Sequence, residues 1–299
     1  MTTSEHAARF THLRPLLFTI VYEILGSATE SDDVLQDSYL RWADVDLATV
    51  RDTKSYLAQL VTSQALNALR TRARRREDYI GPWLPEPLLL DEGDASSDVV
   101  LAESVSMAML VLLETLTPDE RAVFVLREVF GFDYDEISGA VSKSVATVRQ
   151  MAHRAREHVH ARRKRFGPVD TERTAQVTEQ FLSAAATGDM DGLLALLAPG
   201  VTWTADHGGK AAALPRPLVG ARQVAGVMLA LFRSARRRDI RFERAIYNSA
   251  PAVVIYSDGD KLEGVFVFEV IDDVITNLYA MRNPDKLAGI AIPREISRS

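Results

Sequence analysis

The chain has 299 residues, of which 47% are hydrophobic and 25% are charged, with a formal net charge of −6 and no cysteine. This composition is typical of a folded chain of about two domains, and it excludes a protein that is basic throughout. The lack of cysteine excludes disulfides, a thiolate nucleophile and a cysteine-based zinc site, and it favours a cytoplasmic location. The start of the chain lacks the pattern of a signal peptide, and no apolar run reaches the roughly 18 residues of a membrane span.

Residues 5–77 are predicted to form a first helical module. Apolar residues recur at helical spacing between positions 13 and 24, and Gly26 then ends the pattern. The sequence Ser31-Asp32-Asp33 is typical of a helix N-terminus, because the helix dipole favours acidic side chains there. A further helix is predicted from Ser55 to Arg76, and it ends in a basic run.

Residues 78–103 are predicted to be a linker, because the stretch "YIGPWLPEP" holds three prolines, which forbid a helix or a central strand. Flexible linkers are usually built from glycine, serine and charged residues, whereas this one contains a tryptophan. Prolines keep such a segment extended at low entropic cost, so we expect Trp83 and Leu84 to be apolar anchors of a strip that docks on the C-terminal domain. The alternative is that Trp83 only covers the apolar end of the first helical module.

Residues 104–166 are predicted to form a second helical module with a helix-turn-helix. Thr117-Pro118-Asp119-Glu120 has the pattern of a helix start. A short helix from Asp133 to Val141, a turn at 142–144 and a longer helix then follow. An α-helix fits the major groove, where Gln and Arg contact base edges well. The side chains predicted to contact DNA are those of Lys143, Ser144, Thr147, Arg149, Gln150, His153, Arg154 and Arg156. The alternative is an ordinary basic amphipathic helix in a bundle.

After residue 168 the pattern changes to helices followed by strands. Helices are predicted at 171–187, near 190–199 and at 221–235, and strands at 201–204, 240–247, 252–256, 262–271 and 274–281. This order indicates an α+β domain over residues 170–287 with a curved antiparallel sheet. The tail, residues 288–299, has little apolar periodicity, and we expect it to be partly disordered.

Three motifs of the helical modules resemble regions of bacterial extracytoplasmic-function (ECF) sigma factors. The segments 119–128, 132–138 and 147–156 resemble region 4, Glu30–Trp42 resembles region 2.2, and 55–62 with 66–70 resembles regions 2.3 and 2.4. The resemblance extends over residues 5–166. It implies a multidomain chain with two all-α sigma domains, which binds core RNA polymerase and promoter DNA and directs transcription initiation.

The resemblance also implies roles for individual residues. Region 2.2 would bind the clamp helices of the polymerase β′ subunit through Asp32, Asp33, Gln36 and Asp37. Regions 2.3 and 2.4 would hold unstacked bases and phosphates of the −10 element with Tyr56, Asn67, Arg70, Arg72, Arg74, Arg75 and Arg76. Region 4 would contact the −35 element and the β flap. The alternatives are that Tyr56 is a core residue, that Asn67 makes a local hydrogen bond, and that Asp32 and Asp33 only start a helix.

The C-terminal domain resembles the SnoaL-like branch of the NTF2-like cone fold. Three segments are similar to the WLPEP, DGGGK and NPDKL motifs of the ECF41 (SigJ-type) group, although His207 stands where that group usually has glycine. This resemblance implies that the C-terminal domain controls the sigma regions in place of a separate anti-sigma factor. The implied regulatory residues are Trp83, Leu84, Pro85, Glu86, Pro87, Asp206, His207, Lys210, Asn283, Pro284, Asp285, Lys286 and Leu287.

Two other functions stay open, a ligand-responsive DNA-binding regulator and a SnoaL-like enzyme domain fused to a sigma factor. The acidic segment 30–37 favours polymerase binding, since a simple repressor has no need for it. Asp206, His207 and Lys210 are titratable, but acid–base catalysis needs burial beside a pocket. Gly208-Gly209-Lys210 lacks the remainder of a phosphate loop, and the histidines lack metal-ligand spacing. We therefore predict no enzyme activity, no catalytic residue, no cofactor and no metal, and we leave open a small ligand in the cone pocket.

Overall fold

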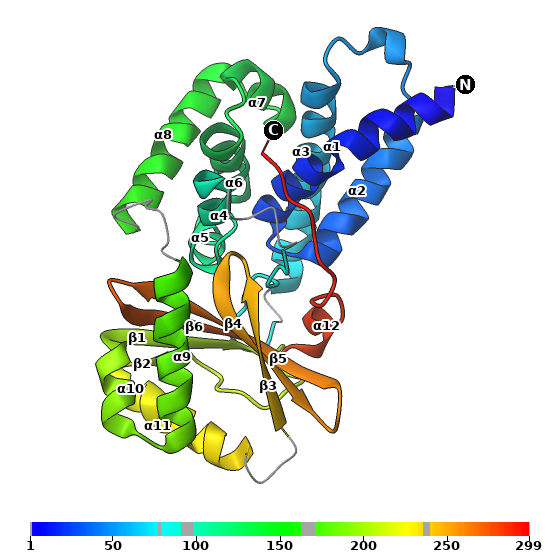
Figure 1. The fold of residues 1–299 in the computed structure, drawn as a ribbon. Helices are drawn as coiled ribbons and strands as arrows, with labels where there is room; N and C mark the ends of the chain where they lie inside the picture. Colours follow the sequence, from blue (N-terminus) through cyan, green and yellow to red (C-terminus); the bar gives the residue numbers. More distant parts are fainter. Residues whose placement is uncertain (1, 77–78, 91–97, 163–170, 236–239, 299) are drawn as a thin grey trace.

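The structure, a computed structural model, describes residues 2–76, 79–90, 98–162, 171–235 and 240–298. In Figure 1 the helices of the first half of the chain lie together at the top, and a curved sheet with its own helices lies below them. Within the described ranges, no helix is long and apolar enough to cross a membrane.

The first helical module consists of α1 (Thr2–Leu25), α2 (Ala28–Ala43), a short 3-10 helix (Leu47–Thr49) and α3 (Thr53–Arg76). Gly26 ends α1 with a φ of 67°, a left-handed conformation that suits glycine. Helix α2 begins before the predicted start at Ser31, because the Ser27 side chain caps the helix by accepting from the N–H of Glu30. Ser31 is buried and donates its hydroxyl to the carbonyl of Ser27 instead.

The second helical module contains the predicted helix-turn-helix. Its elements are α4 (Val99–Ser104), α5 (Met107–Leu113), α6 (Pro118–Phe124), a π-helical turn (Val125–Val129), α7 (Tyr134–Val141) and α8 (Val145–Arg162). Capping boxes form at Thr117 with Glu120 and at Asp133 with Glu136. The predicted apolar face of α8 is buried in a core that the two helical modules share. Prediction of the helix-turn-helix is therefore confirmed.

The C-terminal domain is the predicted α+β domain. Its elements are α9 (Thr171–Thr187), α10 (Met190–Leu196), β1 (Leu197–Asp206), β2 (Leu218–Val219), α11 (Ala221–Ala235), β3 (Ile240–Tyr247), β4 (Ala250–Ser257), β5 (Lys261–Ile271), β6 (Val274–Met281) and α12 (Pro284–Leu287). The strand order is β2-β1-β6-β5-β4-β3. The sheet is mixed, since β1 pairs parallel with β6 while the other pairs are antiparallel.

The two faces of the sheet pack against different partners. Successive side chains of a strand point to opposite faces. Val253 and Phe266 therefore join the core formed with α9 and α11. Val254 and Val265 belong to a separate cluster with Leu84 of the linker and with Met107 of α5. This second face also contacts Leu287 of α12, and it docks on the linker and on the second helical module.

The expectation of a partly disordered tail is wrong for residues 288–298. The tail runs from α12 to the helical modules (Figure 1), and Ile290 and Ile296 are buried. Arg294 pairs with Asp32, and Arg298 pairs with Asp98. Because these partners lie far away in the sequence, the local pattern of apolar residues could not predict that the tail is ordered. The predicted boundary between residues 166 and 170 lies outside the described residues.

Candidate functional site

The linker is held by a cluster of buried and partly buried residues, which we call the linker clasp: Tyr79, Trp83, Leu84, Asp206 and Lys286. Asp206 ends β1 and is fully buried. The Nζ atom of Lys286 donates to Oδ2 of Asp206 at 2.7 Å and to the carbonyl of Leu84 at 2.6 Å. The N–H of Leu84 also donates to Asp206, at 2.9 Å, and the Tyr79 hydroxyl donates to the other carboxylate oxygen. Two side chains of the C-terminal domain thus bind the main chain of the linker.

Burial is the main cause of the pKa shifts of Lys286 and Tyr79 in the linker clasp. It lowers the pKa of Lys286 to about 8, although the Asp206 carboxylate acts in the opposite direction. Burial and the hydrogen bond to Asp206 raise the pKa of Tyr79. The Lys286 ammonium is therefore held by specific partners in a site where charge is otherwise disfavoured.

Trp83 contacts cations from two parts of the molecule. The Nζ atom of Lys286 lies 3.9 Å from a ring centroid of Trp83, and the guanidinium carbon of Arg72 in α3 lies 4.7 Å from one. Both distances are within the range of cation–π attraction. A side chain on Gly26 would meet the Trp83 ring, so the indole also packs against the end of α1. Trp83 thus joins the first helical module to the C-terminal domain.

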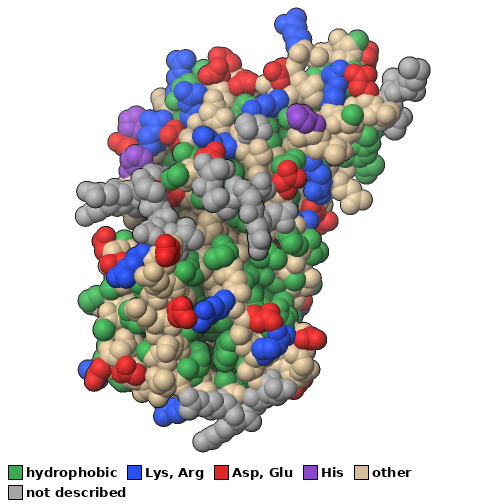
Figure 2. All heavy atoms as spheres, viewed as in Figure 1, with side chains coloured by type: hydrophobic (Ala, Val, Ile, Leu, Met, Phe, Trp, Pro, Cys, Tyr) green, Lys and Arg blue, Asp and Glu red, His purple; other side chains and the backbone are tan. Residues whose placement is uncertain are grey.

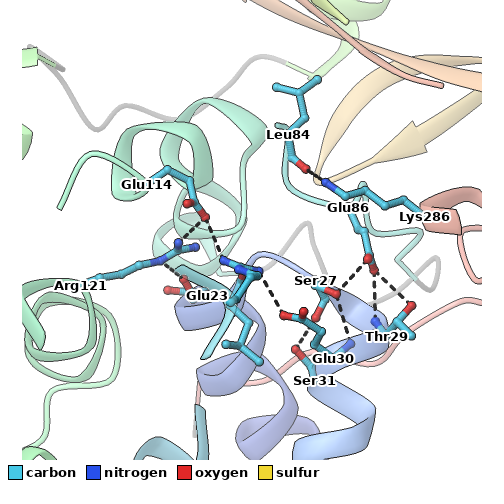
Figure 3. A network of polar contacts seen from close by, with 12 residues as sticks. Glu23, Ser27, Thr29, Glu30, Ser31, Leu84, Glu86, Glu114, Arg121 and Lys286 are labelled. Carbon is cyan, nitrogen blue, oxygen red and sulfur yellow. Dashed lines mark hydrogen bonds and ion pairs between the residues drawn. The ribbon is translucent and has the colours of Figure 1, made fainter. Parts of the chain in front are cut away.

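Glu86 attaches the same linker to the start of α2. Its buried carboxylate accepts from the Ser27 hydroxyl at 2.8 Å, and from the N–H and hydroxyl of Thr29 at 3.1 and 3.3 Å (Figure 3). A carboxylate at a helix N-terminus is stabilised by the helix dipole. Helix α2 is the helix of the predicted polymerase-binding residues. The linker therefore touches both that helix and the C-terminal domain.

His207, the departure from the glycine-rich motif, fills a space beside the linker. The imidazole is buried, and its Nδ1 accepts from the N–H of Gly209 at 3.0 Å. A Cβ atom on Gly81 would lie 2.4 Å from Nε2 of His207, and Gly81 has a φ of 87°. Gly81 is therefore doubly constrained, by its left-handed backbone and by the histidine ring.

The predicted regulatory residues differ in how far their side chains are exposed. The buried ones, in the linker or in the C-terminal domain, include Leu84, Pro85, Glu86, Pro87, Asn283 and Leu287. Asn283 donates to the Tyr79 hydroxyl at 2.9 Å. Pro284 is exposed, and Lys210 and Asp285 form an exposed ion pair.

Asn248 is an interdomain residue that sequence reasoning missed. Its amide donates to the Tyr22 hydroxyl at 2.8 Å and to the carbonyl of Val105 at 2.7 Å, while it accepts from the N–H of Leu88 at 2.7 Å. It has a φ of 51° in the β3–β4 turn. Asparagine is common in such turns, so the sequence signalled a turn and not a contact with the helical modules.

The predicted DNA-contacting residues of the two helical modules meet at one carboxylate. Arg70 of α3 lies 2.9 Å from one oxygen of Asp119, and Lys143 of the helix-turn-helix lies 3.6 Å from the other. Toward the start of α3, Ser55 and Gln59 donate to the carboxylate and the carbonyl of Glu136 in α7. The face of α3 that holds Arg70 thus lies against the helix-turn-helix.

Some of the other predicted DNA-contacting side chains contact residues of the second helical module, and others are exposed. Arg154 pairs with Glu120, Arg156 with Glu128, and Arg149 lies over the Tyr134 ring. On the face seen in Figure 2, basic and acidic side chains are interspersed over the helical modules. Exposed side chains are those of Ser144, Thr147, Gln150, His153 and Asn67, and Tyr56 is 37% exposed beside Trp42. The side chains of Arg74, Arg75 and Arg76 lie outside the described part of the chain.

A buried network joins the two helical modules (Figure 3). Arg121 of α6 donates to the carbonyl of Glu23 at 2.8 Å and also binds Glu114. Arg72 of α3 pairs with Glu114 at 3.6 Å and with Glu30 at 3.1 Å. The Glu23 carboxyl accepts from Ser104 at 2.7 Å, and burial raises its pKa to about 8. Burial thus favours the neutral form of the Glu23 carboxyl.

The predicted polymerase-binding residues lie on α2. Asp33, Gln36 and Asp37 are exposed. Asp32 is partly covered, because Arg14 lies 3.0 Å from one carboxylate oxygen and Arg294 of the tail lies 2.7 Å from the other.

Comparisons with known proteins agree with this arrangement. Residues 9–75 match the family described as Sigma-70 region 2, and residues 106–159 match Sigma-70, region 4. The ECF RNA polymerase sigma factor SigJ of Mycobacterium tuberculosis is 32% identical over 295 residues, which cover 94% of this chain and 93% of that protein. The chain belongs to the ECF RNA polymerase sigma factors. It therefore binds RNA polymerase and promoter DNA in transcription initiation, with region 2 in the first helical module and region 4 in the second.

Two further comparisons extend the likeness. The probable ECF RNA polymerase sigma factor SigI of Mycobacterium tuberculosis is 30% identical over 195 residues, 64% of this chain and 67% of that protein. The crystal structure of SigJ from the same organism matches with a TM-score of 0.74 at 29% identity, and the match covers 96% of this sigma factor and 99% of that chain. The likeness to SigJ thus includes the C-terminal domain. These relatives are named as sigma factors.

Proposed function

We propose that the C-terminal domain controls this sigma factor by holding the linker between regions 2 and 4, in place of a separate anti-sigma factor. The observation that supports this most directly is the linker clasp. Asp206 and Lys286 bind the linker main chain, while Trp83 of the same linker contacts Arg72 of region 2. The proposed domains are residues 5–77, 104–166 and 170–287, with the linker at 78–103 and the tail at 288–299.

The separation of the two promoter elements supports the closed arrangement as the inactive one. The −10 and −35 elements are about 25 base pairs apart, which is about 85 Å at the rise of B-DNA. Arg70, proposed for the −10 element, and Lys143, proposed for the −35 element, instead share the carboxylate of Asp119. Regions 2 and 4 must therefore separate before both elements can be bound.

The proposed contacts in the open state follow the sigma regions. Exposed Asp33, Gln36 and Asp37, together with Asp32, would bind the β′ clamp helices, and region 4 would bind the β flap and the −35 element. This takes place in the cytoplasm, where the polymerase acts. Catalysis by Asp206 is disfavoured, because its carboxylate is already bound by Lys286, Leu84 and Tyr79 and faces the linker.

Run-off transcription with core RNA polymerase tests the proposed control. Lys286→Met removes the clasp ammonium from the full chain while it keeps the apolar stem, and Lys210→Met removes an exposed lysine as a control. We expect Lys286→Met to raise promoter output and Lys210→Met to leave it unchanged. Equal output from the two variants and the unchanged chain would contradict control by the C-terminal domain.

A further inference from the structure

A cavity of ≈ 420 Å³ lies between α9, α11 and the strands β3 to β5. Its volume is in the range of small-molecule sites. Most of its lining is apolar and includes Met228, Phe232, Phe242, Val253, Phe266 and Phe268. It lies on the face of the sheet that is opposite the linker, among the core residues of the C-terminal domain.

Aromatic rings form part of the cavity wall. Phe232 of α11 and Phe242 of β3 stack with ring centroids 4.9 Å apart and an interplanar angle of 8°. Phe242 is nevertheless 38% exposed, and it is a large apolar side chain at the edge strand of the sheet. Such a wall favours a ligand with a flat apolar body.

The polar end of the cavity is electrically balanced. Arg282 lies 3.2 Å from one carboxylate oxygen of Glu263. The other oxygen accepts from Ser257 and from Lys261, each at 2.8 Å. Asp258 adds one further carboxylate to the lining. Arg282 of the lining and exposed Lys261, which both pair with Glu263, thus balance the two carboxylates, and a charged ligand at Glu263 or Arg282 would have to break an existing ion pair.

We propose that this cavity binds a neutral, mainly apolar small molecule with one hydroxyl or carbonyl end. The aromatic and aliphatic walls contact its body, and Ser257 and the Arg282–Glu263 pair hydrogen-bond its polar end. A few well-placed polar groups fix the orientation of ligands in sites of this kind.

The cavity also adjoins the linker clasp. The N–H of Arg282 donates to the carbonyl of Asp206 at 2.7 Å, and Arg282 directly precedes Asn283. Along β4, Val253 faces the cavity while Val254 faces the linker side of the sheet. A ligand that shifts β4 or Arg282 therefore acts on the linker clasp. The effect of a ligand on the sigma regions through the linker clasp rests on the proposed function, whereas the binding of a ligand in the cavity does not.

The site is tested with three naphthalene probes on the full chain by isothermal titration calorimetry. We expect saturable binding of neutral 2-naphthol, and binding of the anion 2-naphthoate that is weaker by about tenfold or more. Naphthalene, which lacks the polar end, is expected to bind more weakly than 2-naphthol. No saturable binding of 2-naphthol, or tighter binding of 2-naphthoate, would overturn the proposal.

Variants locate the binding. Val253→Phe fills the cavity from β4, and Ser234→Trp fills it from the exposed end of α11, where the fold tolerates change better. Ala230→Trp is the control, since Ala230 is exposed on the same helix and does not line the cavity. We expect both cavity variants to weaken 2-naphthol binding by about tenfold or more and the control to leave it unchanged. Unchanged binding in both cavity variants overturns the site.

The link to the linker has its own readout. Saturation with 2-naphthol is expected to change hydrogen exchange of residues 79–90. Binding that leaves their exchange unchanged would contradict the link, while the transcription assay of Lys286→Met still decides the proposed control.

Discussion

Lys286 and Asp206 form a buried ion pair, with 2.7 Å between Nζ and Oδ2, and both side chains also bind the main chain of Leu84 in the linker. The removal of one member of a buried pair leaves the other charge uncompensated, which costs about 3–5 kcal/mol. An exposed ion pair contributes about 0–1 kcal/mol. The linker is therefore held mainly by its buried contacts, whereas the surface pair Lys210–Asp285 joins two segments of the C-terminal domain.

We expect Asp206→Asn to loosen the linker, because the Lys286 ammonium then lacks its buried counter-charge. Hydrogen exchange of residues 79–90 is expected to accelerate, and the free energy of unfolding in urea to fall by about 3 kcal/mol. Asp285→Asn, which removes the carboxylate of the exposed pair, is the control and is expected to change the free energy by less than about 1 kcal/mol. Equal effects of the two substitutions would show that the buried pair has no special part in holding the linker.

Trp83→Ala is expected to separate the C-terminal domain from the sigma regions. The substitution removes the ring that Arg72 and Lys286 both contact, and each such cation–π contact contributes about 0.5–2 kcal/mol. Small-angle scattering should show a larger radius of gyration, with the helical content unchanged by circular dichroism. Trp83→Phe keeps a smaller ring and should expand the molecule less. If the scattering profiles of both variants match that of the unchanged chain, Trp83 does not hold the C-terminal domain against the sigma regions.

Removal of the tail contact is expected to improve binding to core RNA polymerase. Arg294→Ala removes the contact of the tail with Asp32 and leaves Arg14 beside the other carboxylate oxygen. Because the pair is partly exposed, we expect a gain in affinity of about fivefold at most. Glu295→Ala, at an exposed neighbouring position, is the control. An affinity for core polymerase that Arg294→Ala leaves unchanged or lowers would contradict masking of Asp32 by the tail.

Glu23 makes the packing of regions 2 and 4 sensitive to pH. Burial raises its pKa from 4.5 to about 8, so its contribution to stability is fully present below about pH 4.5 and is lost as the pH rises through 8. The free energy of unfolding should therefore fall between about pH 5 and pH 8, and Glu23→Gln, which is neutral throughout, should reduce this fall. Urea unfolding at several pH values measures both slopes. The same slope in the variant and the unchanged chain would show that Glu23 does not cause the pH dependence.

Local signals in the sequence predicted the helices and the helix-turn-helix well. Thr117 with Glu120 and Asp133 with Glu136 form the expected capping boxes, since the partners are three residues apart. The start of β1 at Leu197 was missed, because it depends on pairing with Ile275 in β6. Asp119 was predicted only as part of a helix start, although it holds Arg70 and Lys143. Contacts between distant segments depend on the packed fold and leave no local pattern.

The interdomain site was predicted in part. The tryptophan in a proline-rich linker indicated docking on the C-terminal domain, and residues of the segments 206–210 and 283–287 were among the implied regulatory residues. The resemblance to the group motifs, rather than any periodicity, suggested these segments. The contact of Trp83 with Arg72, the Asn248 contacts and the pairing of Arg294 with Asp32 were not predicted, because each joins residues of different domains.

The distance between regions 2 and 4 shows most directly whether the linker clasp keeps them together. The chain has no cysteine, so Ser63→Cys in α3 and Ala146→Cys in α8, both at exposed positions, can be spin-labelled without background. Double electron–electron resonance should give one short, narrow distance distribution in the full chain and in Lys210→Met. Lys286→Met should give a longer and broader distribution. A short, narrow distribution in Lys286→Met as well would contradict the account.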